Sequence, residues 1–310
     1  MTIVNYSDVH NGTFFKSDVC IIGSGMSAQS LAATISEFNN KQITIIESGG
    51  IDFEKKVQSL NNFHNKGIIF RENHQNRIRQ LGGSANLWAN QLMMLNPLDI
   101  KDRNWIAENL SWPVNYEELK TYYSAALKLV YEDYFKNVDL FNPEENEKYI
   151  SFLENEFTQF NIFKLNNHFW PGKIEKFNKK TKFTKKLLNS DNIKFFEFFT
   201  ATKIHVNKNT QFAESFEILF KDKKCIIKSN IFILACGAIE NARLLLNNAK
   251  DNKILQNNNI GKYFMEHPKI NLGILKSNKG LPLSYLFGIK KSNYNYQQTI
   301  KLSEKIQRDK

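Results

Sequence analysis

The sequence predicts an α/β fold built on a doubly wound parallel sheet. Three observations carry this prediction. The apolar run Val19–Ile22 leads into a glycine-containing turn, apolar residues then recur at the spacing of one helix face, and a second apolar run, Ile43–Ile46, ends on the acid Glu47. Strand, turn, helix and strand in this order are typical of a βαβ unit with parallel strands.

The turn after the first strand has the pattern of a phosphate-binding loop. Gly23 permits a tight turn, Gly25 lets the backbone approach a pyrophosphate, and Ala28 lets the following helix pack closely on the strand. The helix N-terminus offers free N–H groups and the positive end of its dipole. The sequence therefore favours a dinucleotide site over a phosphate-free crossover, with the phosphates held by Gly23, Ser24, Gly25, Met26 and Ser27.

The helix and the second strand complete this unit. Glu47 is placed to accept hydrogen bonds from an adenosine ribose. Because Ser48, Gly49 and Gly50 follow it, with no Arg or Lys for a 2′-phosphate, NADP is disfavoured, whereas NAD and FAD both remain open. The residues that predict the helix face are Ala28, Leu31, Ala32, Ile35 and Phe38.

Further elements are expected downstream. Asn115 precedes a predicted helix, Tyr116–Tyr134. Short strands, among them Lys194–Phe199 and Ser215–Phe220, predict a small meander between Asn192 and Lys228. The apolar run Ile231–Gly237 is too short to span a bilayer and predicts a buried central strand that returns to the first sheet. Such a late return is familiar from two-domain flavoproteins.

Five segments, in order, resemble the glucose-methanol-choline (GMC) oxidoreductase family. Four are the N-terminal unit, Arg79–Trp88, Ile233–Leu245 and Asn259–Pro268. The fifth, Trp112–Leu119, is similar to the sugar-oxidising (pyranose oxidase-like) branch. The matches run from about residue 15 to 275 in family order and spacing.

This resemblance implies FAD as the cofactor and an alcohol or sugar hydroxyl as the substrate. It also implies a doubly wound, Rossmann-like FAD-binding domain interleaved with a partial α+β substrate domain. The expected FAD-binding segments are 1–95 and 192–268, and the expected substrate-domain segments are 96–191 and a truncated 269–310. The further cofactor-binding residues that it implies are Ser48, Arg79, Gly82, Gly83, Ser84, Asn86, Leu87, Ala235, Cys236 and Gly237.

The resemblance also bears on attachment and catalysis. Leu87 stands where some members carry a histidine bonded to the flavin, so FAD is expected to bind non-covalently. The catalytic histidine of the family is expected beyond Lys310, and no catalytic residue is assigned here. His267 is a weak candidate because it matches a family turn, and the other histidines lack the spacing of a metal site.

Composition is typical of a soluble, cytoplasmic protein. Cys20, Cys225 and Cys236 are scattered thiols, and no secretory signal or membrane span is visible. The net charge of +11 and the basic run Lys173–Lys186, which contains two phenylalanines, could indicate nucleic-acid binding. Because lysine is enriched throughout the chain and no nucleic-acid motif is present, we interpret the run as a solvated surface.

Two functions from different classes follow. One is an FAD-dependent oxidoreductase acting on CH–OH groups of a small alcohol or sugar, completed by a C-terminal complementing chain or region. The alternative is a non-catalytic FAD-binding or interaction protein that has lost its catalytic half. The coding sequence after residue 310 is expected to separate the two: a frame that encodes the missing family region supports the first function, and a long unrelated region supports the second.

Overall fold

The computed structural model describes residues 2–38, 40–67, 76–101, 103, 111–135, 163–171, 176–265, 289–290 and 294–308. The chain forms two compact units, each made of two sequence segments. The first unit comprises Met1–Trp88 and Lys176–Asn271, and the second comprises Ala89–Glu175 and Leu272–Lys310. From the sequence, we expected the segment boundaries after residues 95, 191 and 268. One reason for the difference is that helix α5 (Lys182–Leu188) packs against helix α1 (Met26–Phe38) of the first unit.

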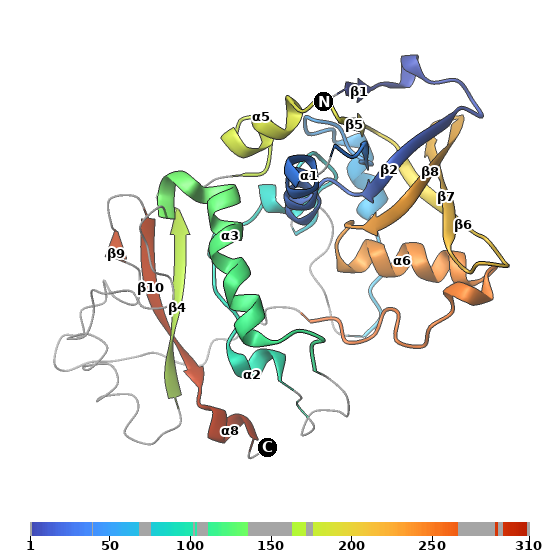
Figure 1. The fold of residues 1–310 in the computed structure, drawn as a ribbon. Coiled ribbons are helices and arrows are strands. Elements are labelled where there is room, and N and C mark those ends of the chain that lie inside the picture. The colour runs from blue at the N-terminus through green and yellow to red at the C-terminus, as the bar shows by residue number, and fades with distance from the viewer. Residues whose placement is uncertain are drawn as a thin grey trace. The chain divides into compact units, whose positions relative to one another are not determined.

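The first unit is built on a seven-stranded sheet in the order β1-β5-β3-β2-β8-β7-β6 (Figure 1). From β1 to β8 every neighbouring pair is parallel, whereas β8, β7 and β6 are joined antiparallel. The strands are β1 (Thr2–Val4), β2 (Phe14–Ile22), β3 (Ile43–Ile46), β5 (Ile193–Phe196), β6 (Thr200–Val206), β7 (Ala213–Phe220) and β8 (Lys223–Leu234).

Helices cover both faces of this sheet. Alternate residues of β2 point to opposite sides: Val19 and Ile21 share one apolar cluster with Ala28 and Ala32 of α1. Cys20 and Ile22 share the other cluster with Leu244 of α6 (Ala238–Ala249). In Figure 1, α1 and α6 accordingly lie on opposite sides of β2 and β8. The doubly wound α/β fold predicted from the sequence is confirmed.

Two details of the sheet differ from the sequence prediction. Lys194–Phe199 is not part of a separate meander, because β5 inserts between β1 and β3 in the parallel part of the sheet. Ile231 is not buried: it lies on β8 and is 56% exposed. The pairing of β7 stops at Lys228, so among the described residues Ile231–Leu234 pair with β2 alone.

Helix α1 also buries a different set of residues from the one expected. Leu31 is 40% exposed, while the polar Gln29 is fully buried. Periodicity alone could not predict this, because the fate of Gln29 depends on hydrogen-bonding partners that lie far away in the sequence.

The second unit contains a three-stranded antiparallel sheet in the order β4-β10-β9, formed by β4 (Phe163–Pro171), β10 (Tyr294–Leu302) and β9 (Ile289–Lys290). Its helices are α2 (Pro97–Ile100), α3 (Tyr116–Phe135) and α8 (Glu304–Arg308). As predicted, α3 follows Asn115, whose Oδ1 accepts a hydrogen bond of 2.8 Å from the Glu117 N–H.

Short 3₁₀ helices complete the described elements. They are η1 (Tyr6–Asp8), η2 (Lys56–Asn61), η4 (Gly83–Asn86) and η5 (Lys253–Leu255). No helix among the described residues is long and apolar enough to cross a membrane.

The two strands of the β2–β8 pair predict different sensitivities to truncation. Ile21→Ala removes a fully buried side chain and should lower the free energy of unfolding by about 3 kcal/mol. Ile231→Ala, on the neighbouring strand, should cost less than about 1 kcal/mol, because the side chain is already half-exposed. Urea denaturation of both variants measures the difference. Equal losses would mean that this edge of β8 is covered in solution.

Candidate functional site

A cavity of about 570 Å³ opens at the carboxyl ends of β2, β3 and β8. This is within the range of roughly 300–1,000 Å³ that is usual for ligand sites. Ligands of doubly wound sheets bind at such strand ends. The residues expected at the cofactor that line the cavity are Gly23, Ser24, Gly25, Met26, Ser27, Glu47, Ser48, Arg79, Gly83, Ser84, Ala235, Cys236 and Gly237.

Two glycine turns that lie far apart in the sequence meet at this cavity. The Gly82 N–H donates a hydrogen bond of 2.9 Å to the Ser24 carbonyl, and Gly25 and Gly82 form a parallel bridge. A Cβ on Gly83 would lie 3.2 Å from the Gly25 Cα. A side chain on Gly83 would therefore crowd the backbone of the first turn.

Three of the expected cofactor residues do not line the cavity. Gly82 is buried beneath the turn, where its φ of 93° and the nearby Phe177 carbonyl both require glycine. The buried Asn86 donates to the Leu81 and Gly83 carbonyls at 2.9 and 3.2 Å, so it holds the turn in shape. Leu87 is 43% exposed. Two of these residues therefore build the turn rather than the cavity wall.

The two glycines of the first turn have different surroundings. A Cβ on Gly23 would overlap the Ala235 carbonyl, and its φ is 102°. A Cβ on Gly25 would have no atom within 4 Å. Gly23 is therefore required by the fold itself, whereas Gly25 leaves open a space that a ligand can occupy.

Glu47 is held by the turn that it faces. Its Oε2 accepts from the Ser24 N–H at 3.0 Å and the Ser24 hydroxyl at 2.6 Å, and its Oε1 accepts from the Gly49 N–H at 2.8 Å. Burial raises the pKa of the Glu47 carboxyl, and the Ser24 and Gly49 bonds and Arg79 oppose that rise. A ribose hydroxyl would have to share this carboxylate with Ser24.

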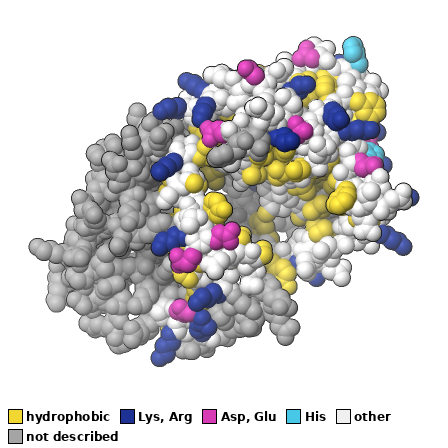
Figure 2. All heavy atoms as spheres, viewed as in Figure 1, with side chains coloured by type: hydrophobic (Ala, Val, Ile, Leu, Met, Phe, Trp, Pro, Cys, Tyr) yellow, Lys and Arg dark blue, Asp and Glu magenta, His cyan; other side chains and the backbone are white. Residues whose placement is uncertain are grey.

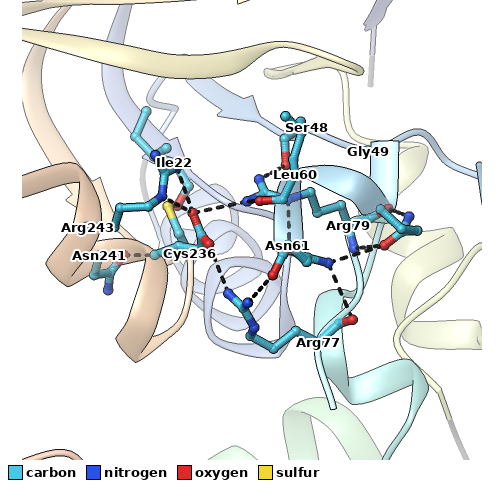
Figure 3. A network of polar contacts seen from close by, with 12 residues as sticks. Ile22, Ser48, Gly49, Leu60, Asn61, Arg77, Arg79, Cys236, Asn241 and Arg243 are labelled. Atoms are coloured by element: carbon cyan, nitrogen blue, oxygen red, sulfur yellow. Dashed lines mark hydrogen bonds and ion pairs between the residues drawn. The ribbon is translucent and has the colours of Figure 1, made fainter. Parts of the chain in front are cut away.

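Three arginines surround one glutamate at the cavity wall (Figure 3). The Glu240 carboxylate of α6 lies 2.9 Å from Arg77, 3.0 Å from Arg79 and 2.7 Å from Arg243. Burial opposes ionisation of Glu240, but Arg79 and Arg243 outweigh it, and the pKa of Glu240 is lowered. One carboxylate against three guanidinium groups leaves a surplus of positive charge here.

The position of Arg79 differs from what the residues after Glu47 suggested, namely that no Arg or Lys lies near the end of β3. Its Nη1 lies 2.8 Å from the Ser48 hydroxyl, so a cation does reach the end of β3. The sequence around Glu47 could not indicate this, because Arg79 arrives from a distant segment. The guanidinium is committed to other partners as well, since Nε donates to the Asn61 side chain at 2.9 Å and Nη2 to the Leu60 carbonyl at 3.2 Å.

Sequence reasoning did not assign several lining residues. Arg77, Glu240 and Arg243 are among them, as are Phe264 and Met265. One signal was present, because Arg77 and Arg79 stand two positions apart, and alternate residues of an extended segment point the same way.

Among the described residues, no group of three His, Cys, Asp or Glu side chains could hold a metal ion. His267 lies outside the described residues. Cys20 and Cys225 are fully buried, whereas Cys236 is only partly buried. Burial raises the pKa of the Cys236 thiol to about 12, and the thiol donates to the Ile22 carbonyl.

On the face shown in Figure 2, the positive charges of the described residues are interspersed with negative ones. In the described residues of Figure 2, Lys and Arg side chains (dark blue) are scattered among Asp and Glu (magenta) and form no single stripe on the visible face. Within the run Lys173–Lys186, Lys186 pairs with Glu37 and Lys179 with Asp52, at 2.5 Å each. This distribution agrees with a solvated surface.

The arginine cluster predicts a loss of stability when its shared acid is neutralised. Glu240→Gln should lower the free energy of unfolding at pH 7 by about 3 kcal/mol, because three guanidinium groups then lie together without a counter-charge. The depressed pKa gives ionised Glu240 a stabilising role above its ordinary pKa of 4.5, which is lost as the pH falls through the folded-state value. The difference between wild type and variant, measured by urea denaturation, should therefore shrink on acidification. A difference that is constant with pH would contradict this role.

The glycine turn predicts two distinct outcomes for one type of substitution. Gly25→Val should leave the fold intact, because the new side chain projects into open space, and should abolish dinucleotide binding by filling that space. Gly23→Val should instead destabilise the fold by colliding with Ala235. Thermal unfolding and ligand titration distinguish the two. Normal ligand affinity in Gly25→Val would place the site elsewhere.

No protein-family model matches this sequence, and no curated protein matches it. Among solved structures, pyridoxine 4-oxidase from Mesorbium loti aligns with a TM-score of 0.50 at 15% identity, over 75% of this chain and 52% of that chain. A variant of formate oxidase from Aspergillus oryzae aligns with a TM-score of 0.47 at 14% identity, over 78% of this chain and 48% of that chain. The chain thus spans about half the length of these structures. The likeness to pyridoxine 4-oxidase is one of α/β fold.

Proposed function

We propose that this chain forms the FAD-binding part of an FAD-dependent oxidoreductase that acts on CH–OH groups of an alcohol or sugar, as in the GMC family that its motifs resemble. One observation carries the proposal. The two glycine turns of that resemblance, 23–25 and 82–84, meet backbone to backbone beside Glu47 at the carboxyl edge of the sheet. An oxidase name for a protein of the same fold, pyridoxine 4-oxidase, agrees with it.

The residues present fit a dinucleotide. Open space above Gly25 leaves room for a pyrophosphate at the N-terminus of α1. Glu47 and Ser48 lie at the end of the neighbouring strand, where an adenosine ribose binds in this type of fold. The surplus positive charge of Arg77, Arg79 and Arg243 favours a ligand that carries phosphates.

The roles of this chain's own residues are binding and orientation. When bound, FAD supplies the acceptor for the hydride of the substrate. Gly25 has no side chain in the space proposed for the pyrophosphate, and the Glu47 carboxylate can accept a hydrogen bond from the ribose. Leu87 has a hydrocarbon side chain that cannot form a bond to the flavin, which supports non-covalent binding.

One experiment tests both the identity of the cofactor and whether it is bound covalently to the protein. The purified chain should bind FAD in a fluorescence titration, and acid precipitation should release all of the flavin into the supernatant as FAD. Glu47→Ala should weaken this binding about tenfold or more, as expected when a hydrogen bond to a charged group is lost. Flavin that stays with the precipitate would refute non-covalent attachment, and binding of NAD without FAD would refute the cofactor.

Catalysis is tested on the FAD-loaded protein. With this chain alone, an alcohol or sugar donor should bleach little or none of the flavin absorbance under anaerobic conditions, because the catalytic base is expected outside it, and adding the complementing C-terminal region should restore bleaching. FAD binding without bleaching by any donor, even with that region present, would leave the alternative, a non-catalytic FAD-binding protein. No catalytic residue is proposed within the described residues, and the complementing C-terminal chain stays a prediction.

A further inference from the structure

A buried glutamine, Gln29, contacts the first glycine turn, residues 23–25, through the Ser24 carbonyl. It is fully buried on α1, in the helix that begins at the turn. Its side-chain Nε2 donates to the Ser24 carbonyl at 3.1 Å and to the Phe177 carbonyl at 2.8 Å. Its Oε1 accepts a bond of 2.7 Å from the hydroxyl of Thr184, which is also fully buried. A buried amide with three close partners has a fixed orientation.

The Ser24–Gly25 peptide needs such a restraint. A peptide next to glycine can rotate as a unit at low cost, because glycine tolerates most backbone conformations. One side of this peptide is the Ser24 carbonyl, which accepts from both Gln29 and the Gly82 N–H. The peptide is trans, so the N–H of Gly25 points away from these two donors.

The orientation of this peptide decides what the cavity presents to a ligand. Gly25 lines the cavity, and its surroundings are open. In the observed orientation, the carbonyl is turned toward Gln29 and Gly82, so the N–H lies on the opposite side of the peptide. After rotation by half a turn, a carbonyl oxygen would face the phosphates, and it would repel them.

We infer that Gln29, held by Thr184 and Phe177, is a positioning residue that fixes the Ser24–Gly25 peptide with its N–H toward the phosphates of the bound dinucleotide. This inference rests on the proposed dinucleotide site. It also couples that site to the segment 177–184, which lies about 150 positions away in the sequence and contacts Gln29 as well as the second glycine turn at Gly82 and Asn86.

The test compares four variants. Gln29→Leu removes the donor and should weaken FAD binding about tenfold, independently of pH. Gln29→Glu places a carboxylate against two carbonyl oxygens and should weaken binding more than tenfold at pH 8. It should recover toward pH 5, where the protonated acid can donate. Thr184→Val should weaken binding a few-fold, and Thr34→Val, an exposed threonine on the same helix, should have no effect.

A second measurement does not require FAD. In the ligand-free protein, Gln29→Leu and Gln29→Glu should speed hydrogen exchange of the Gly82 amide, which is bonded to the Ser24 carbonyl, while the Ile21 amide of β2 keeps the wild-type rate. Faster exchange at Gly82 alone supports the inference even if the wild-type protein binds no FAD, and that result would refute the proposed function only. Unchanged exchange at Gly82, equal acceleration at Gly82 and Ile21, or a Gln29→Glu affinity that is flat between pH 5 and 8 would overturn the inference.

Discussion

The contact between the Ser24 carbonyl and the Gly82 N–H joins two segments separated by more than fifty residues, and the site depends on it. It holds the first turn, at the end of β2, against the second turn, which runs into η4. Residues of both turns line the cavity beside this contact, and the space next to Gly25 is open. In the proposed site this backbone would face the pyrophosphate, because peptide N–H groups are good donors to phosphates.

Two acids that line the cavity have different surroundings. Glu47 accepts hydrogen bonds from hydroxyl and N–H donors, and burial raises its pKa. Glu240 is shared by three arginines and its pKa is lowered. The Glu47 carboxylate accepts hydrogen bonds from the turn, and Glu240 gathers three arginines at the cavity wall.

Local patterns in the sequence predicted the βαβ unit well, because each of its parts is encoded by adjacent residues: β2, the glycine turn, α1 and β3. The burial of Gln29 and the contact of Arg79 with Ser48 could not be predicted, because the partners Thr184 and Ser48 come from other parts of the chain. The exposure of Ile231 was missed for a similar reason. An apolar strand pattern indicates burial, but burial requires a neighbour on each side of the strand, and only the fold provides one.

The central claim is that both glycine turns form one binding surface for FAD. Hydrogen-exchange mass spectrometry of the wild-type protein with and without FAD measures this directly. FAD should protect peptides that cover residues 23–29 and 79–86 to a similar degree and at the same FAD concentration, with little change in β6 and β7. Protection of the first segment alone, or of neither, would contradict the account.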